Sequence, residues 1–204
     1  MICYIRNKKY GVTIELEKIP QNFTTILKEH LKKYNIIYAD PPWYFKSRSE
    51  KGEGRNATQH YDCMSIKDIC DMPVEEIADK DCVLLMWVTD PLLEKAFKVI
   101  DAWGFTYKTV GFTWAKSNKS NMGMFTGLGY WTRCNPEMCL LATKGKPKRV
   151  SKSVAQLVID QRREHSRKPD RIRNDIIELC GDLPRIELFA RQTFDGWDAW
   201  GNEI

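Results

Sequence analysis

Short runs of apolar residues mark most of the strands that this sequence predicts. In Cys82–Val88 every residue is hydrophobic, which is typical of a strand buried on both faces. Asn35–Ala39 is a second apolar run, and it must leave its sheet at Pro41 and Pro42, because two prolines cannot continue a hydrogen-bonded ladder. Further strands are expected at 106–114, 137–143 and 185–190, and an N-terminal hairpin at 1–18.

Apolar residues at helical spacing lie between these strands. Leu92–Trp103 carries a helical stripe that ends at Gly104, and a helix at Pro169–Leu179 ends before Gly181. Other helices are expected at 23–34, 65–71 and 73–78. Two segments lack any periodicity, 44–63 and 116–129, and long loops of this kind in compact domains are usually functional or disordered.

The alternation of strands and amphipathic helices predicts an α/β fold with a mainly parallel central sheet. The 204 residues fit one domain, residues 1–204. In such sheets, ligands bind beyond the carboxyl ends of the strands. Asp40 and Arg191 each follow directly after a predicted strand, so we expect both side chains at one edge of the sheet.

Composition narrows the class of protein. Hydrophobic residues make up 43% of the chain and charged residues 29%, as in a globular protein. Cys82–Val88, the longest apolar run, is too short to span a bilayer, and the N-terminus lacks the apolar core of a signal peptide. The seven cysteines are scattered and the three histidines are well separated. We therefore expect a cytoplasmic protein with reduced thiols, no metal and no membrane partner.

Positive charge is concentrated in one stretch. The net charge is +5, but between Lys144 and Arg173 there are eleven Lys or Arg against three Asp or Glu. A weaker basic group lies within 46–55. A charge run is usually a solvated face, but two basic segments close in sequence to candidate chemistry favour a polyanion partner.

The tetrapeptide Asp40-Pro41-Pro42-Trp43 can activate an aromatic amine. An adenine 6-amino group is a poor nucleophile because its lone pair is delocalised into the ring. The Asp40 carboxylate and the Pro41 carbonyl could accept its two N–H hydrogens and localise that lone pair, while the prolines fix the carbonyl direction. Trp43 would offer a flat face to an extruded base. The structural alternative is that this tetrapeptide only turns the chain sharply out of a strand.

The sequence resembles the adenine-specific amino-methyltransferases of the DPPW type, which include the catalytic subunit of the messenger-RNA adenosine methyltransferase. The resemblance covers about 35–202 in the same order of motifs, and leaves 1–34 outside it. The matching motifs are Tyr38-Ala-Asp-Pro-Pro-Trp43, Tyr61-x-x-Met64, Leu84-Leu-Met-Trp-Val-Thr89, Trp103-Gly-Phe105, Trp114-x-Lys116, Gly129-x-Trp131, Glu137-x-x-Leu140, Lys144-Gly-x-Pro147, Arg163-Glu-His-Ser-Arg-Lys-Pro-Asp170, Ile186-Glu-Leu-Phe-Ala-Arg191 and Gly201-Asn202.

This resemblance implies a Rossmann-like fold that binds S-adenosylmethionine and releases S-adenosylhomocysteine. The chain has no Gly-x-Gly-x-x-Gly, which counts against a nicotinamide enzyme. By resemblance, Lys168 faces the methionine carboxylate and Arg191 reaches the ribose or carboxylate region. His165 is either a cation near that carboxylate or a satisfied polar residue. The cofactor-binding set implied is Asp40, Lys168, Arg191, Thr193, Asn202 and Glu203.

The expected substrate is adenine in a nucleic acid, with DNA favoured over RNA. The loops 45–60 and 116–129 and the basic stretch are expected to hold phosphates and close over the base. The expected substrate-binding residues are Trp43, Tyr44, Lys46, Arg48, His60, Tyr61, Lys146, Lys148 and Arg149. An RNA methyltransferase and a non-catalytic nucleic-acid-binding subunit are the alternatives, and a monomer and a homodimer both remain open.

Overall fold

The computed structural model describes residues 4–7, 12–15, 32–44, 63–118, 123–163, 167–202 and 204. Two short strands pair antiparallel near the N-terminus, β1 (Tyr4–Asn7) and β2 (Val12–Glu15), as expected for the hairpin. The helix expected at 23–34 lies mostly outside the described residues, as does most of the loop 45–60.

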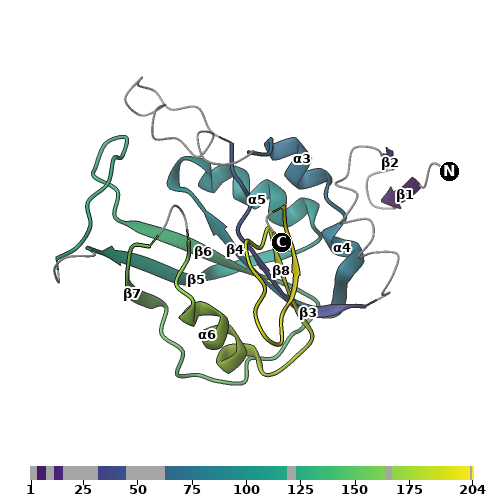
Figure 1. Cartoon of the computed structure of the whole chain (residues 1–204). Helices are drawn as coiled ribbons and strands as arrows, with labels where there is room; N and C mark the ends of the chain where they lie inside the picture. The colour runs from purple at the N-terminus through teal and green to yellow at the C-terminus, as the bar shows by residue number, and fades with distance from the viewer. Residues whose placement is uncertain are drawn as a thin grey trace.

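A seven-stranded sheet forms the centre of the molecule, in the order β7-β5-β6-β4-β3-β8-β9 (Figure 1). Its pairings are parallel except those of β6, which is antiparallel to both neighbours. The strands are β3 (Tyr34–Ala39), β4 (Ala78–Val88), β5 (Thr106–Ser117), β6 (Pro136–Lys144), β7 (Leu157–Gln161), β8 (Arg185–Leu188) and β9 (Asp198–Trp200).

The α/β class is confirmed, but the sheet is mixed, so the expectation of a mainly parallel sheet holds only in part. β5 and β6 are the reason. Antiparallel neighbours need no crossover, and the connection from Ser117 to Pro136 starts and ends at the same edge of the sheet. β7 and β9 were not predicted. They are the two edge strands, and both are short, with five and three residues.

Helices cover both faces of the sheet (Figure 1). On one face α3 (Ile66–Asp71), α4 (Val74–Ile77) and α5 (Leu93–Ala102) pack on Ile37, Leu84 and Met86. The 3-10 turn η3 (Asp90–Leu92) leads into α5. On the other face α6 (Arg171–Cys180) packs on the alternate strand residues, including Ile36, Leu85 and Phe112.

The central strands follow the predicted pattern closely. All seven residues from Cys82 to Val88 are buried, because β4 is covered by helices on both faces. Gly104, with a φ of 79°, follows α5 at the predicted place. Because β3, β4, β5, β7, β8 and β9 run in one direction, their carboxyl ends meet at one edge of the sheet, which we call the carboxyl edge.

Candidate active site

Asp40 is the first residue beyond β3, at the carboxyl edge. Its backbone N–H donates to the carbonyl of Leu188 at the end of β8, 3.4 Å away, so Asp40 lies where two neighbouring strands finish. The N–H of Trp43 donates to the Pro41 carbonyl over 2.8 Å, which closes a tight turn. A carbonyl oxygen has two lone pairs, so Pro41 retains capacity for a second donor.

Trp43 packs as a core residue in this structure. Its side chain is only 4% exposed, and its indole N–H donates to the carbonyl of Trp87 over 2.9 Å. The backbone beside it pairs with Met64, whose N–H donates to Pro42 and whose carbonyl accepts from Tyr44. A stacking role for Trp43 therefore stays a prediction. Tyr44, the next residue, is half exposed.

Lys168 connects two carboxylates next to the tetrapeptide. Its ammonium lies 2.6 Å from Oδ2 of Asp40 and 3.2 Å from Oε2 of Glu137. The other oxygen of Glu137 lies 2.5 Å from the ammonium of Lys116. Lys168 is buried, and its ammonium also lies over the ring of Trp87 at 5.5 Å. Two acids and two lysines thus form one charge-balanced group, which we call the carboxylate–lysine cluster.

Burial and these charges move the pKa values in the cluster in different directions. Burial raises the pKa of the Asp40 carboxyl, and Lys168 offsets this only in part. Burial also acts to raise the pKa of Glu137, but Lys168 and Lys116 together outweigh it and hold that pKa below its usual value. Burial disfavours the charged form of Lys168, yet the two carboxylates raise its pKa above the ordinary lysine value. Lys168 is therefore a cation at neutral pH.

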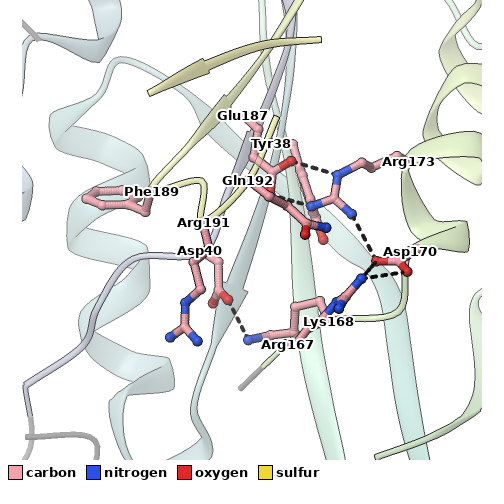
Figure 2. Close-up of a pocket in the computed structure, with 10 residues that line it drawn as sticks. All are labelled: Tyr38, Asp40, Arg167, Lys168, Asp170, Arg173, Glu187, Phe189, Arg191 and Gln192. Carbon is pink, nitrogen blue, oxygen red and sulfur yellow. Dashed lines mark hydrogen bonds and ion pairs between the residues drawn. The ribbon is translucent and has the colours of Figure 1, made fainter. Parts of the chain in front are cut away.

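A cavity of about 230 Å³ opens beside Asp40, between the end of β8 and the start of α6 (Figure 2). Arg173 reaches across it and donates to both oxygens of Glu187 at 2.7 Å. The Arg173 guanidinium also stacks on the ring of Phe194, 3.5 Å from the centroid. Although it is buried and 3.7 Å from Asp170, Nη1 of Arg173 has no hydrogen-bond partner among the described residues.

The segment that carries Lys168 is fixed by Asp170, which precedes α6. Arg163 and Arg167 both donate to its carboxylate. Burial opposes the charged form of Asp170, but the two arginines outweigh it and lower its pKa. Figure 2 shows Arg167 and Arg173 converging on Asp170 while Lys168 points to Asp40. These ion pairs position Lys168 at the cavity mouth.

The other wall of the cavity is a tight turn after β8. Phe189 has a φ of 62°, which is uncommon for any residue but glycine, and its ring packs edge-on against Trp200. Ala190 donates to the carbonyl of Trp200 over 2.9 Å. A Cβ on Gly201 would lie 2.0 Å from the Ala190 carbonyl oxygen, so only glycine allows this approach. The turn directs Arg191 to the cavity.

The structure therefore brings together part of the predicted site. Asp40, Lys168 and Arg191 line one cavity. Thr193 and Asn202 are exposed near the carboxyl ends of β8 and β9. Five of the predicted side chains and His165 lie outside the described residues: Lys46, Arg48, His60, Tyr61 and Glu203.

Lys146, Lys148 and Arg149 are not brought together with Asp40. They follow β6, and the backbone N–H of Lys146 donates to Asp81, 2.7 Å away. Asp81 accepts in turn from Asn35 at the start of β3. β3 spans six residues, so its two ends are roughly 17 Å apart. These three basic residues lie at the edge of the sheet opposite Asp40.

Sequence reasoning assigned no role to Glu137, Lys116, Arg173 or Glu187. Glu137 and Lys116 lie in motifs that carry the resemblance, so their spacing could have indicated them. Glu187 also lies in such a motif, whereas Arg173 does not, so the sequence did not indicate that the two residues pair. They belong to α6 and β8, and only the packing of α6 on the sheet brings them into contact.

Comparison with known proteins identifies the family. The MT-A70 family description matches residues 34–203. The chain belongs to the MT-A70 family. The match begins at β3 and extends past β9, so it includes every strand that ends at the carboxyl edge.

Individual relatives agree with this assignment. The chain is 33% identical over 217 residues to the type II methyltransferase M.MunI of a Mycoplasma species, with 98% of this chain and 89% of that protein covered. It is 26% identical over 178 residues to the human N(6)-adenosine-methyltransferase catalytic subunit METTL3 and 27% identical over 179 residues to an Arabidopsis thaliana N(6)-adenosine-methyltransferase MT-A70-like protein. The chain spans only 29% and 24% of the length of these two proteins.

Four further observations concern the described residues of this MT-A70 protein. No group of three or more His, Cys, Asp or Glu side chains among the described residues could hold a metal ion. In the part of the chain that the structure describes, no helix is long and apolar enough to cross a membrane. Cys82, Cys139 and Cys180 are buried thiols, as expected. Trp87, Trp197 and Trp200 pack in the core.

Proposed function

We propose that this protein transfers the methyl group of S-adenosylmethionine to the 6-amino group of adenine in DNA. The observation that carries the proposal is the position of Asp40. Asp40 lines a cavity at the carboxyl edge, within an Asp-Pro-Pro-Trp turn, in a member of the MT-A70 family. The similarity to M.MunI extends over nearly the whole chain, which supports a methyltransferase acting on DNA.

The cavity residues fit S-adenosylmethionine. The buried Nη1 of Arg173, which has no hydrogen-bond partner among the described residues, is suited to a carboxylate such as that of the methionine group. We propose that Lys168 and Arg191 add positive charge there, and that Thr193, Asn202 and Glu203 bind the ribose or methionine end. When bound, S-adenosylmethionine supplies an electrophilic methyl carbon on a sulfonium.

Asp40 and Pro41 act on the amine. Both are acceptors, so together they can take the two N–H hydrogens of the 6-amino group and localise its lone pair on nitrogen. The nitrogen would bond to the methyl carbon as the bond between that carbon and the sulfonium breaks and S-adenosylhomocysteine leaves, and Asp40 would stabilise the positive charge that develops on nitrogen. The proton leaves once methylation has made it acidic. Catalysis is mainly alignment plus this activation.

Lys168 favours the ionised form of the Asp40 carboxylate, which is the form that accepts from the amine. Burial raises the pKa of Asp40, and the ammonium at 2.6 Å opposes that rise. An ionised carboxylate has two oxygens with about four lone-pair sites. Asp40 can therefore bind Lys168 and the substrate amine together. Glu137 and Asp40 together balance the charges of Lys168 and Lys116, so the cluster stays close to neutral overall.

RNA is the alternative substrate. The similarity to the METTL3 proteins, which are named as N(6)-adenosine-methyltransferases, favours it. The alternative of a non-catalytic subunit would be expected to lose the acid, whereas here Asp40 is present and paired with Lys168. We place the enzyme in the cytoplasm.

The substrate assay measures transfer of a tritiated methyl group to duplex DNA, single-stranded DNA and RNA of matched sequence. We expect transfer to DNA by the wild-type protein and none by Asp40→Asn, while both bind S-adenosylmethionine in calorimetry. Transfer to RNA alone would establish the alternative substrate. Cofactor binding without transfer to any of the three would contradict a catalytic role.

A further inference from the structure

The connection between β5 and β6 presents an exposed aromatic surface. Residues 123–135, which we call the finger, project beyond the ends of these two strands at the left of Figure 1. Trp131 is 99% exposed, and Leu128 and Tyr130 beside it are about half exposed. The other tryptophans whose side chains are described are buried: Trp43, Trp87, Trp103, Trp114, Trp197 and Trp200.

The finger is held in shape by its own hydrogen bonds. The N–H of Gly127 donates to the Cys134 carbonyl over 2.7 Å, and the side-chain amide of Asn135 donates to the carbonyls of Lys116 and Phe125. A Cβ on Gly129 would lie 2.0 Å from the Thr132 carbonyl oxygen, so glycine permits a tight approach of the two arms. The tip therefore presents its aromatic residues from a fixed frame.

The base of the finger is joined to the catalytic residues. Lys116, whose carbonyl accepts from Phe125 and Asn135, binds Glu137 through its ammonium. Glu137 binds Lys168, and Lys168 binds Asp40. Three successive ion pairs thus connect the finger to the carboxylate that would hold the target amine. The finger rises from the same edge of the sheet as the cavity.

The charge of the segment suits a phosphate backbone. Between residues 116 and 133 there are three basic residues, Lys116, Lys119 and Arg133, and no Asp or Glu. The guanidinium of Arg162 lies 4.1 Å from the centroid of the Phe125 ring and adds a further cation at the base. Exposed aromatic side chains among cations are the combination by which proteins bind unpaired bases.

We propose that Trp131 stacks on a base of the substrate duplex beside the target adenine. This inference rests on the proposed function, since an adenine must leave the duplex to reach Asp40. Extrusion removes a stacking partner from the neighbouring bases, and the indole of Trp131 replaces that partner. The finger thus holds the duplex open while Asp40 and Pro41 hold the adenine.

The test compares Trp131→Ala and Trp131→Phe with the control Tyr107→Ala. Tyr107 is also a partly exposed aromatic residue, but it lies at the start of β5, at the opposite edge. Methyl transfer is measured on a fully paired duplex and on one with an abasic site opposite the target adenine. We expect Trp131→Ala to lower kcat/KM about 5- to 100-fold on the paired duplex, which is the range that the stacking of one base on an aromatic side chain contributes. The loss of kcat/KM should be smaller on the duplex with the abasic site.

Trp131→Phe should retain most of the kcat/KM that Trp131→Ala loses on the paired duplex. Tyr107→Ala should have the same kcat/KM as the wild-type protein. Tryptophan emission provides an independent measurement. Duplex DNA should quench the wild-type emission, and Trp131→Phe should remove most of that quenching, because the other tryptophans whose side chains are described are buried.

An equal loss of kcat/KM on both duplexes in Trp131→Ala, or unchanged quenching by DNA in Trp131→Phe, would overturn the stacking role of Trp131. A change in oligomeric state of Trp131→Ala in sedimentation, with DNA binding unaltered, would show that the finger contacts a second copy of the chain instead. Failure of the proposed function is distinguishable, because the wild-type protein would then methylate neither duplex while fluorescence still reports on DNA binding.

Discussion

At the scale of single residues, Asp40 combines two properties that its proposed amine-binding role needs. Burial raises its pKa and so increases the basicity of the carboxylate, while Lys168, 2.6 Å away, opposes that rise and favours the ionised form. Its sequence position after an apolar strand indicated this role. The partner did not follow from sequence, since the resemblance directs Lys168 to the cofactor and Lys168 lies 128 positions away.

Replacing Asp40 by Asn should abolish detectable methyl transfer, and the loss of kcat must be at least tenfold, which corresponds to ~1.4 kcal/mol of transition-state stabilisation. The amide has one acceptor oxygen and no negative charge, so it cannot stabilise the cation that forms on nitrogen. Stopped assays at saturating DNA and cofactor give kcat, and calorimetry should show cofactor affinity within a few fold of the wild type. A smaller loss of kcat would mean that another group accepts from the amine.

Glu137→Gln should lower stability in a pH-dependent manner. The pKa of Glu137 is held below its usual value, so its ionised form stabilises the fold above about pH 4.3, the ordinary value, and this contribution disappears as the pH falls through the lowered pKa. Urea unfolding should therefore show a deficit of about 1.5–3 kcal/mol at pH 7, typical for hydrogen bonds to charged groups, that narrows below pH 4.

The control for this experiment is Glu94→Gln. Glu94 forms a surface pair with Lys95, and its side chain is 79% exposed. Surface pairs contribute little to stability, so this variant should match the wild-type protein at each pH. A Glu137→Gln deficit that stayed constant from pH 7 to pH 3 would show that the residue acts through packing rather than charge.

At the scale of elements, the strand ends determine the site. The prediction placed strands near 35–39, 82–88, 106–114, 137–143 and 185–190, and helices near 65–71, 73–78, 92–103 and 169–179, and each has a counterpart in the structure. Apolar runs, and the glycines that follow the helices, were sufficient to predict these elements. β7 and β9 could not be found in this way, because the apolar run of β7 has only three residues, Leu157–Ile159, and β9 has three residues in all.

The turn between β8 and β9 depends on Gly201. In Gly201→Ala the added methyl would lie 2.0 Å from the Ala190 carbonyl oxygen, and the backbone must move. We expect a loss of about 1–3 kcal/mol in unfolding free energy, as for other overpacked sites, and a several-fold weaker affinity for S-adenosylmethionine because Arg191 moves with the turn.

Gly111→Ala is the matched control for the turn. It lies in β5, where a new Cβ would meet the Leu85 and Leu141 side chains at 3.1 and 3.2 Å. This variant should lose stability without losing cofactor affinity. Equal cofactor affinity in both variants would mean that the β8–β9 turn does not position the cofactor.

At the scale of the whole molecule, charge is divided between two edges of the sheet. The sequence showed a basic stretch from 144 to 173 but not how the fold divides it. Lys146, Lys148 and Arg149 lie at the start of β3, whereas Arg162, Arg163, Arg167 and Lys168 lie at the carboxyl edge with Asp40. The division arises because the chain runs along β7 between these two groups of residues, and β7 ends at the carboxyl edge.

This division predicts different salt effects from two sets of substitutions. Changing Arg133 and Arg162 to Gln should flatten the slope of log affinity against log salt by roughly 0.7–0.9 for each phosphate that is no longer neutralised. Changing Lys146, Lys148 and Arg149 together should leave that slope and methyl transfer unchanged. Filter binding of duplex DNA across a range of salt concentrations measures both. A flatter slope in the triple variant would show that the duplex reaches the opposite edge.

The identity of the methylated nucleoside tests the central claim most directly. Duplex DNA is incubated with S-adenosylmethionine and either the wild-type protein or Asp40→Asn, digested to nucleosides and separated by liquid chromatography with mass detection. The arrangement of Asp40 and Pro41 around an exocyclic amine predicts N6-methyl-deoxyadenosine from the wild-type protein and none from the variant. Methylation of cytosine, of a ring nitrogen of adenine, or of adenine by both proteins would contradict it.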